Sequence, residues 1–545
     1  MQSEAVRFLQ QATMGATAAD IDLVMQLGYG AWLDEQFAMP VQYSHASTVK
    51  RVADAIVDVH WSHRPGIWQV NNSMWRGLVS NADQLRQRVM FGLSQIFVVS
   101  LRDGATYYLG SGLAAFVDML YAKSFGNFRD LLESVTLSTA MGAYLSHLYN
   151  RKENPATGSR PDQNFAREVM QLFSIGLWEL HADGTRRLDA RGQPIPTYGT
   201  ADVVGASRVM TGWAFDGATD AHWNGHYGFW DAKDMPAQEK PMKAFAHHHS
   251  TLEKTFLGTT IAASVTPDPE SDLKTFLDTL FKHPNVGPFI GRQLIQRLVT
   301  SNPSPAYVGR VSAVFNNNGS GVRGDMKSVI RAILLDTEAR SQSSVTWNQF
   351  GRLREPILRM AQLMRVFKAR ALADPDSYAI GMWTYDRNKG LWQTPLGANS
   401  VFNFYLPHYT PPNSALAREG LVAPEMQITT QSSVSDMAFL FLDVLQNGGI
   451  TDCCSDALRN TFKTKFDYSE WLPLVADPPQ LCERLSLVFM AGQMSAALED
   501  NIVRAMAKRY RGQSETSGID RGLTQIRLAE AVHLMLFSPE YVVQK

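Results

Sequence analysis

The sequence predicts a mainly α protein, built as one large multi-helical domain with two long aromatic-rich loop insertions. Apolar residues recur at the spacing of amphipathic helices over most of the 545 residues. Strand signals are short and few. Capping residues stand at expected helix ends, as Thr17 does before Ala18–Asp22 and Ser538 does after the last helix.

The periodic segments divide the chain into a helical core over residues 1–370, an insertion over 371–431 and a C-terminal helical part of the same fold over 432–545. The helices expected in chain order are Glu4–Thr13, Ala18–Phe37, Ser73–Ser100, Ser111–Ser124, Phe128–Thr139, Thr200–Thr211, Asp272–Leu280, Val286–Val299, Pro303–Asn316, Met326–Leu335, Arg354–Lys368, Ser432–Gln446, Pro479–Met490, Ser495–Lys508 and Gly522–Leu536.

A further helix is expected over Pro161–Glu179, with Asp162 as its N-cap. At about 100° per residue, its apolar side chains share one arc and its polar ones the other. The polar arc holds Gln163, Asn164, Arg167, Glu168, Gln171 and Ser174. Amides and an Arg with a Glu suit fixed hydrogen bonds better than hydration, so we interpret this arc as one wall of a polar cleft. The alternative is an ordinary helix interface joined by an Arg–Glu pair.

Two stretches break the helical pattern and are expected to be loops. Residues 214–260 are rich in His, Trp, Tyr, Phe and Gly, and residues 377–427 contain a run rich in proline and aromatic residues. Compact domains rarely carry loops longer than about 12–15 residues unless those loops have a function.

Charge and composition exclude several classes of partner and location. Lys and Arg (51) nearly balance Asp and Glu (52), so we expect no nucleic-acid partner. No apolar run is long enough for a transmembrane segment. Residues 1–12 resemble an amphipathic helix and do not resemble a signal peptide, as expected for a mature or trimmed chain. Cys453 or Cys454 could pair with Cys482, or all three thiols could be free.

Nine motifs in a fixed order identify a family resemblance that runs from about Ala5 to Val543. They are RFLQQATMGAT near the start, LRQRVMFGLSQIFVVS at 85–100, MGAYLSHLYN at 141–150, the Pro161–Glu179 helix, DVVGASRVMTGW at 202–213, HSTLEKTFLG at 249–258, REPILRM at 354–360, SVFNFYLPHYTPPN at 400–413 and APEMQI at 423–428. Together they resemble the bacterial family called domain of unknown function 1800.

The resemblance implies an exported protein, periplasmic or extracellular, whose relatives are often encoded beside a sulfatase-like protein. The family pattern at the central helix reads Pro, Asp or Asn, Glu, Asn, then Tyr or Phe, Ala, Arg and Glu. Asn164, Arg167 and Glu168 match this pattern, but Gln163 stands where the family has Glu. Gln163 is therefore the amide form of a carboxylate position.

Glycosidic bond cleavage generally needs two carboxyl groups, one protonated and one ionised. We expect Glu168 as acid/base, with the Glu-like position at Gln163 as its possible partner. Five residues on a helix place these two about 140° apart, so another carboxylate could be the partner instead. The candidates for that role are Asp162, Asp183, Asp202 and Glu425. A salt bridge is the alternative role for Glu168.

The residues expected to bind substrate come from the central helix and from the two loops. They are Asp162, Asn164, Arg167, Gln171, Trp213, Trp223, Trp230, His249, Lys254, Asn403 and Tyr405. Aromatic side chains such as Trp223 and Trp230 stack on the apolar faces of sugar rings, although they can also pack their own loop down.

The histidine run His247–His249 suggests metal or acid–base chemistry. No His-Glu-x-x-His or Cys-x-x-Cys spacing accompanies it, so we expect no metal and no cofactor. Of the three histidines, His249 falls on a family motif together with Lys254. That pair is expected to bind an anionic or hydroxylated group.

The sequence therefore favours an exported carbohydrate-active hydrolase acting on a poly- or oligosaccharide. The absence of a Gly-x-Ser-x-Gly elbow and of a glycine-rich phosphate loop lowers the odds for esterases, proteases, kinases and dinucleotide enzymes. Two alternatives remain open. One is a non-catalytic binding or assembly protein that partners a sulfatase-like neighbour, and the other is a metal-bearing redox protein that uses the histidine loop.

Overall fold

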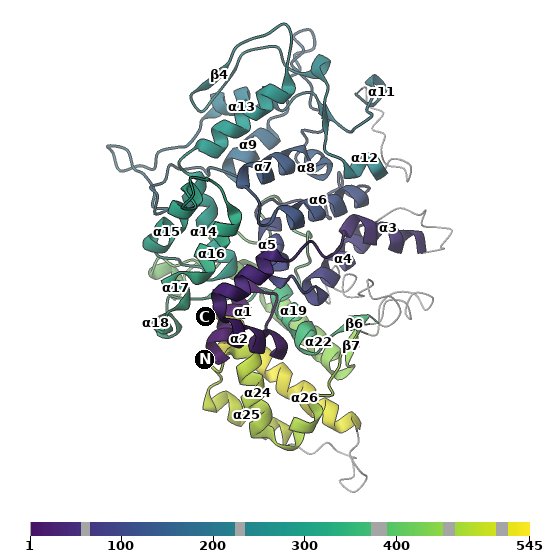
Figure 1. Cartoon of the computed structure of the whole chain (residues 1–545), viewed down its shortest axis with the longest axis vertical. Helices are drawn as coiled ribbons and strands as arrows, with labels where there is room; N and C mark the ends of the chain where they lie inside the picture. The colour runs from purple at the N-terminus through teal and green to yellow at the C-terminus, as the bar shows by residue number, and fades with distance from the viewer. Residues whose placement is uncertain (1, 56–65, 224–234, 372–389, 451–463, 508–520) are drawn as a thin grey trace.

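The computed structural model describes residues 2–55, 66–223, 235–371, 390–450, 464–507 and 521–545. The described chain is mainly α-helical, as the sequence predicted (Figure 1). Figure 1 shows α9 and α13 toward one end of the molecule, α24 to α26 at the other, and both termini between them.

The first half of the chain holds these helices: α1 Gln2–Ala12, α2 Ala18–Ala38, α3 His45–Ala55, α4 Ile67–Ser80, α5 Gln84–Ser94, α6 Gly110–Lys123, α7 Phe128–Leu137, α8 Thr139–Tyr144, α9 Asn164–Gln171, α10 Thr200–Val209, α11 Asp220–Trp223, α12 Met235–Glu239, the 3-10 helix η2 Ala246–His248 and α13 Pro269–Lys282.

The second half holds these: α14 Val286–Leu298, α15 Pro305–Asn316, α16 Met326–Leu335, α17 Thr337–Arg340, α18 Gln342–Thr346, α19 Pro356–Val366, α21 Ala415–Arg418, η3 Pro424–Ile428, α22 Gln431–Gln446, η4 Leu472–Ala476, α24 Pro478–Met490, α25 Ala496–Met506, α26 Arg521–Leu536 and α27 Pro539–Val542.

The described strands are two or three residues long and pair antiparallel, as β1 with β2, β3 with β4, β5 with β9, and β8 between β6 and β7. Their bounds are β1 Trp213–Ala214, β2 Lys243–Ala244, β3 Lys254–Phe256, β4 Thr259–Ile261, β5 Arg352–Leu353, β6 Arg370–Ala371, β7 Gly449–Ile450, β8 Thr464–Lys465 and β9 Val543–Gln544. The β5–β9 pair joins the middle of the chain to its C-terminal end.

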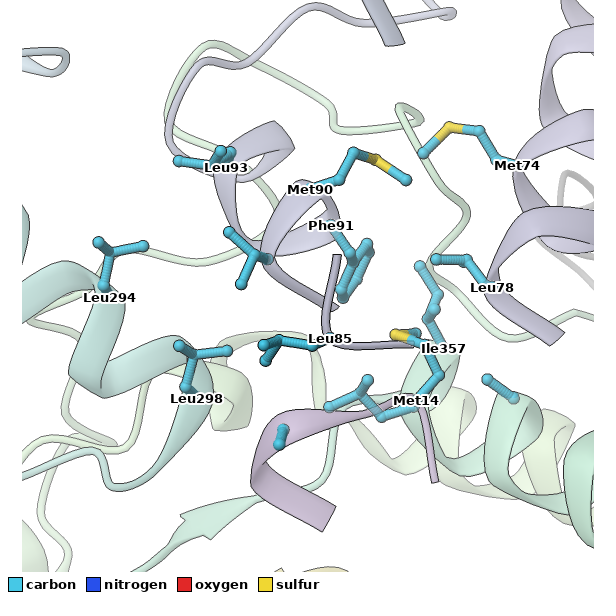
Figure 2. Packing of buried hydrophobic residues seen from close by; sticks show 14 of the residues in the cluster. Met14, Met74, Leu78, Leu85, Met90, Phe91, Leu93, Leu294, Leu298 and Ile357 are labelled. Carbon is cyan, nitrogen blue, oxygen red and sulfur yellow. The ribbon is translucent and has the colours of Figure 1, made fainter. Parts of the chain in front are cut away.

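Helices α5 and α19 form the centre of the core, because every residue of both is buried. Figure 2 shows Phe91 and Leu85 of α5 among Leu78 of α4, Leu298 of α14 and Ile357 of α19. The same hydrophobic cluster continues from Ala5 to Tyr541. The N-terminal and C-terminal helices therefore share one core.

The expected single helix Ser73–Ser100 is wrong, since the structure breaks it into α4 and α5. Asn81 ends α4 in an extended conformation, and Asp83 occupies the N-cap position of α5. The carboxylate of Asp83 accepts a hydrogen bond from the Tyr121 hydroxyl of α6. This tertiary contact holds the break in place.

The capping prediction at Thr17 is confirmed. Its hydroxyl accepts from the Asp20 main-chain N–H, and Asp20 Oδ2 accepts in return from the Thr17 N–H at 3.0 Å, which is a capping box. Ser538 lies at the N-terminal end of the short helix α27, where it accepts from the N–H of Tyr541.

The two expected loops contain short pieces of regular structure. Residues 214–260 include α11, α12, η2 and β3 in their described part, and residues 390–427 include α21 and η3. Cys482 is buried and not in a disulfide, while Cys453 and Cys454 lie outside the described residues. Among the helices that the structure describes, none combines the length and the apolar character needed to cross a membrane.

Candidate functional site

The expected central helix Pro161–Glu179 is wrong in its bounds, since α9 covers only Asn164–Gln171. Gln163 occupies the N-cap position without a side-chain cap, while Asp162 Oδ1 accepts from the Asn164 N–H at 2.8 Å. After α9 the chain turns at Gly176, whose φ of 73° suits glycine and whose N–H donates to the Met170 carbonyl at 3.0 Å. The glycine turn therefore prevents the helix from reaching Glu179.

The predicted polar arc is accessible only in part, because Glu168 and Ser174 are buried. Asp162, Asn164 and Arg167 are exposed, and Gln163 and Gln171 are half-buried. Gln171 Oε1 accepts from the Tyr198 hydroxyl at 3.1 Å. These side chains are therefore not sealed inside the core.

Glu168 differs from its neighbours on this arc because it is only 7% exposed. Its Oε2 atom is buried and has no hydrogen-bond partner among the described residues. Burial raises the pKa of Glu168, and the positive charge of Arg167 opposes that rise only in part. Burial and the charge of Glu168 together raise the pKa of Tyr198 to about 12. Burial therefore makes the proton of Glu168 harder to remove than that of an exposed glutamate.

A cavity of about 1000 Å³ opens at the start of α9. It is lined by Gly104, Ala105, Tyr108, Gly142, Ala143, Ser146, Leu148, Tyr149, Asn150, Arg151, Ser159, Arg160, Asp162 and Phe215. Of the site residues predicted from the sequence, the lining includes Asp162. Asn164 lies beside it, because its Nδ2 is 3.5 Å from the Ser146 hydroxyl.

Two lining residues hold a backbone conformation that side chains rarely adopt. Ser146 has a φ of 61° and Tyr149 a φ of 63°. Left-handed residues other than glycine cost free energy and concentrate at functional sites. The segment between α8 and α9 therefore shows local strain where it forms the cavity wall.

The cavity combines flat aromatic walls with charged groups. Tyr108, Tyr149 and Phe215 supply the aromatic faces, and Arg151 and Arg160 supply two exposed guanidinium groups. Neither arginine forms an ion pair with another described residue. The lining can therefore stack on a planar ligand face and donate hydrogen bonds to its oxygen atoms.

Most of this lining was not predicted from the sequence, although one of the family motifs supplies much of it. MGAYLSHLYN at 141–150 contributes Gly142, Ala143, Ser146, Leu148, Tyr149 and Asn150. The family motif could have indicated a functional segment. Its mostly apolar residues instead suggested a part of the core.

Trp213, His249 and Lys254 were expected to bind substrate, but none of them lines this cavity. Trp213 is buried in β1, and its Nε1 donates to the Val209 carbonyl at 3.3 Å. His249 Nε2 lies 3.0 Å and Lys254 Nζ 2.9 Å from Asp272 Oδ2, on helix α13. The His and Lys therefore satisfy a buried aspartate, which explains their family motif structurally.

Asn403 and Tyr405 lie apart from α9, in the buried centre of the fold. The Tyr405 hydroxyl donates to Glu355 Oε2 at 2.8 Å, and the same oxygen accepts from the side-chain amides of Gln95 and Gln393 at 2.6 Å each. Asn403 is also buried. Neither residue is on the lining of the cavity.

The carboxyl group of Glu425, a proposed partner of Glu168, belongs to the same buried network. Arg352 Nη2 lies 2.7 Å from Glu425 Oε1 and 3.1 Å from Glu355 Oε1. Four family motifs, at 85–100, 354–360, 400–413 and 423–428, supply Gln95, Glu355, Tyr405 and Glu425 to this network. These motifs therefore hold the core together.

The remaining two predicted partners of Glu168 have local roles. Asp183 Oδ1 accepts from the Thr185 N–H and hydroxyl in an exposed turn. Asp202 accepts from the N–H groups of Gly199 and Leu257, at 2.8 and 2.7 Å, at the start of α10. Neither lines the cavity.

Trp223 is buried behind the cavity wall and is not an exposed platform. Its ring stacks on that of His248, with centroids 3.8 Å apart, and meets the Tyr149 ring edge-on at 5.2 Å. Trp230 lies outside the described residues. Trp223 thus supports Tyr149 from behind.

Three side chains beside Trp223 could hold a metal ion. His247, His248 and Asp220 each offer a ligand atom, and these atoms all lie within 4.8 Å of one another. Burial, with the neighbouring charges of His247 and Arg151, lowers the pKa of His248 to about 4. Its imidazole is therefore neutral near pH 7.

Searches among curated proteins and among solved structures found no match. A model of the family described as "Protein of unknown function (DUF1800)" matches residues 7–543.

Proposed function

The chain belongs to the DUF1800 family, and from this premise we propose that it is an exported carbohydrate-active hydrolase that binds a saccharide in the cavity at the start of α9. The observation that carries the proposal is the buried carboxyl of Glu168, on the helix that begins at this cavity. One of its oxygens has no hydrogen-bond partner among the residues that the structure describes.

The composition of the cavity wall supports a saccharide as ligand. Sugars present flat apolar faces between rings of hydroxyl groups, and Tyr108 and Tyr149 offer aromatic faces to them. Asp162 and the two arginines offer hydrogen-bonding groups at the same wall. The volume of about 1000 Å³ is large enough for more than one sugar ring.

The carboxyl groups on and beside α9 support hydrolysis. A glycosidase needs one carboxylic acid that keeps its proton near neutral pH, and burial raises the pKa of Glu168 in that direction. Asp162 is exposed and lines the cavity, as suits the second carboxyl. Asn164 and Glu168 are one helical turn apart, about 6 Å along the axis. A saccharide that extends from Asp162 along α9 would approach Glu168.

Gln163 stands between these two carboxyl groups in the sequence and is half-buried at the N-cap of α9. In the family pattern a Glu occupies this position. If the amide has replaced a working carboxylate, then Gln163→Glu should increase turnover while leaving the fold unchanged.

The proposal is tested by binding a panel of neutral and acidic oligosaccharides to the full chain, with isothermal titration calorimetry as readout. Tyr108→Ala should weaken the binding of the saccharide by about 0.5–1.5 kcal/mol, because it removes an aromatic face. Phe439→Ala is the matched control, since Phe439 is an aromatic residue on α22 that is 72% exposed and away from the cavity lining. Equal effects of the two substitutions, or no binding by the wild-type chain, would overturn the proposal.

One observation favours a second function. Glu168 itself is not on the cavity lining, which fits a protein that binds saccharide, or assembles with a sulfatase-like partner, without cleaving it. Binding without release of reducing ends would select this function. Copurification with the partner and no saccharide affinity would select assembly alone.

A further inference from the structure

The short helices α11 and η2 bring Asp220 next to two adjacent histidines. His247 Nε2 lies 3.1 Å from Asp220 Oδ1, and His248 Nε2 lies 3.7 Å from the same oxygen. Asp220 and His247 are 27 residues apart in the chain, so the fold creates this cluster and the sequence spacing does not reveal it.

These distances suit a shared ion. Zinc binds imidazole nitrogen and carboxylate oxygen at about 2.0–2.2 Å, so two ligand atoms of a tetrahedral site lie about 3.3 Å apart. The two separations from Asp220 Oδ1, 3.1 and 3.7 Å, lie on either side of this value. Small side-chain rotations would bring all three atoms to one ion.

The surroundings of the His248 imidazole also suit metal binding. Its Nε2 atom is buried and has no hydrogen-bond partner in the described part of the chain, although it is directed toward the Asp220 carboxylate. The stacked indole of Trp223 holds the His248 ring in this orientation. An imidazole nitrogen that is fixed in place and lacks a partner is suited to bind a metal ion.

We propose that His247, His248 and Asp220 form a site for a divalent transition-metal ion, with Zn²⁺ as the ion that best fits two imidazole nitrogens and one carboxylate oxygen. Three protein ligands leave at least one coordination position open. The exposed side of the site, formed by His247 and Asp220, leaves that position to water or to a ligand oxygen.

Two positively charged side chains near the site weaken the binding of a cation. Arg151 and Lys152 both lie close enough to His248 to lower its pKa, and their positive charges reduce the affinity for a metal ion. The same charges would favour an anionic ligand on the metal's open position. Arg151 also lines the cavity, so this arginine lies near both the metal site and the cavity.

The metal site would also support the cavity wall through aromatic contacts. His248 stacks on Trp223, and Trp223 meets Tyr149, which lines the cavity. An ion that fixes His248 therefore restrains the ring behind Tyr149. This inference does not rest on the proposed hydrolysis, since it needs only the three ligand side chains.

The test is calorimetric titration of the metal-free full chain with Zn²⁺, with Co²⁺ as a spectroscopic probe of coordination. The wild-type chain should bind one ion per chain at this site, with visible Co²⁺ absorption bands. Substitution of groups that only support metal ligands lowers affinity about 10–100-fold, so Asp220→Asn and His247→Ala should each weaken Zn²⁺ binding at least about tenfold. Both side chains are exposed, which keeps the fold intact.

His181→Ala is the matched control, because His181 is an exposed histidine in another turn of the described chain. It should leave the affinity and the Co²⁺ spectrum unchanged. The proposal fails if the wild-type chain binds no stoichiometric ion, or if Asp220→Asn and His247→Ala bind Zn²⁺ as tightly as the wild type does. Equal weakening by His181→Ala would show non-specific histidine binding and would also overturn it.

Discussion

Asn150 and Asp162 exchange two hydrogen bonds across the cavity wall. The Asp162 N–H donates to Asn150 Oδ1 at 2.8 Å, and Asn150 Nδ2 donates to the Asp162 carbonyl at 3.1 Å. The Gly212 N–H also donates to the Asn150 carbonyl at 2.8 Å. Asn150 therefore fixes the start of α9 against the segment that carries Tyr149.

Replacing Asn150 should loosen both the fold and the cavity. Asn150→Ala leaves two main-chain groups of Asp162 without partners, so the free energy of unfolding should fall by about 1–3 kcal/mol. Urea denaturation measures this loss. A change below about 0.5 kcal/mol, the range of ordinary surface substitutions, would contradict the clamping role.

Glu168→Gln should stabilise the protein at neutral pH. The folded-state pKa of Glu168 lies above its ordinary value of 4.5, so the folded chain holds this proton more tightly than the unfolded chain does. The stability from Glu168 is then fully present below about pH 4.5 and is lost as pH rises through the raised pKa. The amide removes this loss because it cannot ionise.

The measurement is urea denaturation of wild type and Glu168→Gln between pH 4 and pH 8. The difference in unfolding free energy should grow with rising pH in favour of the variant. Glu133→Gln serves as a control, since Glu133 is an exposed residue of an i,i+4 ion pair on α7. A difference that shrinks with rising pH would show that Glu168 is ionised and well paired.

The two buried glutamates around Arg352 should respond differently to substitution. Glu355 accepts from Tyr405, Gln95 and Gln393, and Arg352 with these partners lowers its pKa despite burial. Burial instead raises the pKa of Glu425, and one of its oxygens has no partner among the described residues.

Glu355→Gln should therefore cost about 3–5 kcal/mol of unfolding free energy, the range for breaking a buried charge pair. Glu425→Gln should cost clearly less, because burial raises the pKa of Glu425 and so reduces the cost of losing its charge. Thermal and urea denaturation of both variants measure the difference. Equal costs, or the reverse order, would contradict the assignment of Glu355 as the better-satisfied charge.

Asp272→Asn should destabilise the fold while leaving the cavity intact. Burial opposes ionisation of Asp272, but the contacts with His249 and Lys254 outweigh it and lower its pKa. Its contribution to stability is present above about pH 3.8 and is lost as pH falls. Removing the charge leaves Lys254 buried without its partner, which costs about 3–5 kcal/mol.

Asp278→Asn is the control on the same helix, since Asp278 pairs with Arg129 and Lys274 near the surface and should cost about 1 kcal/mol or less. Circular dichroism during urea denaturation compares the two variants. If Asp272→Asn were neutral for stability but abolished saccharide binding, His249 and Lys254 would belong to the binding site after all.

Local sequence patterns predicted the positions of most helices. They did not predict helix ends that are determined by tertiary contacts. Thr17 and Asp20 form a capping box that the sequence shows directly. The breaks at Asp83 and Gly176 also had local signals, an N-cap residue and a glycine, but continuous helical periodicity obscured them. A periodic pattern shows where a helix could continue and not where it ends.

The site was harder to predict because sequence does not distinguish a buried polar group from an exposed one. His249, Lys254 and Tyr405 are polar residues in family motifs, and each satisfies a buried carboxylate. Glu168 is also a buried polar residue in a family motif, but one of its oxygens has no partner within the described ranges. Only the three-dimensional arrangement separates these cases, and it also brings Asp220 to His247.

The most direct test of the proposed hydrolysis is release of reducing ends from the oligosaccharide that binds most tightly. The assay compares wild type, Glu168→Gln and Gln163→Glu at pH 5–7. We expect release by the wild type, its loss in Glu168→Gln and faster release by Gln163→Glu. Tight saccharide binding with no release by the wild type or by Gln163→Glu would contradict hydrolysis and leave a binding protein.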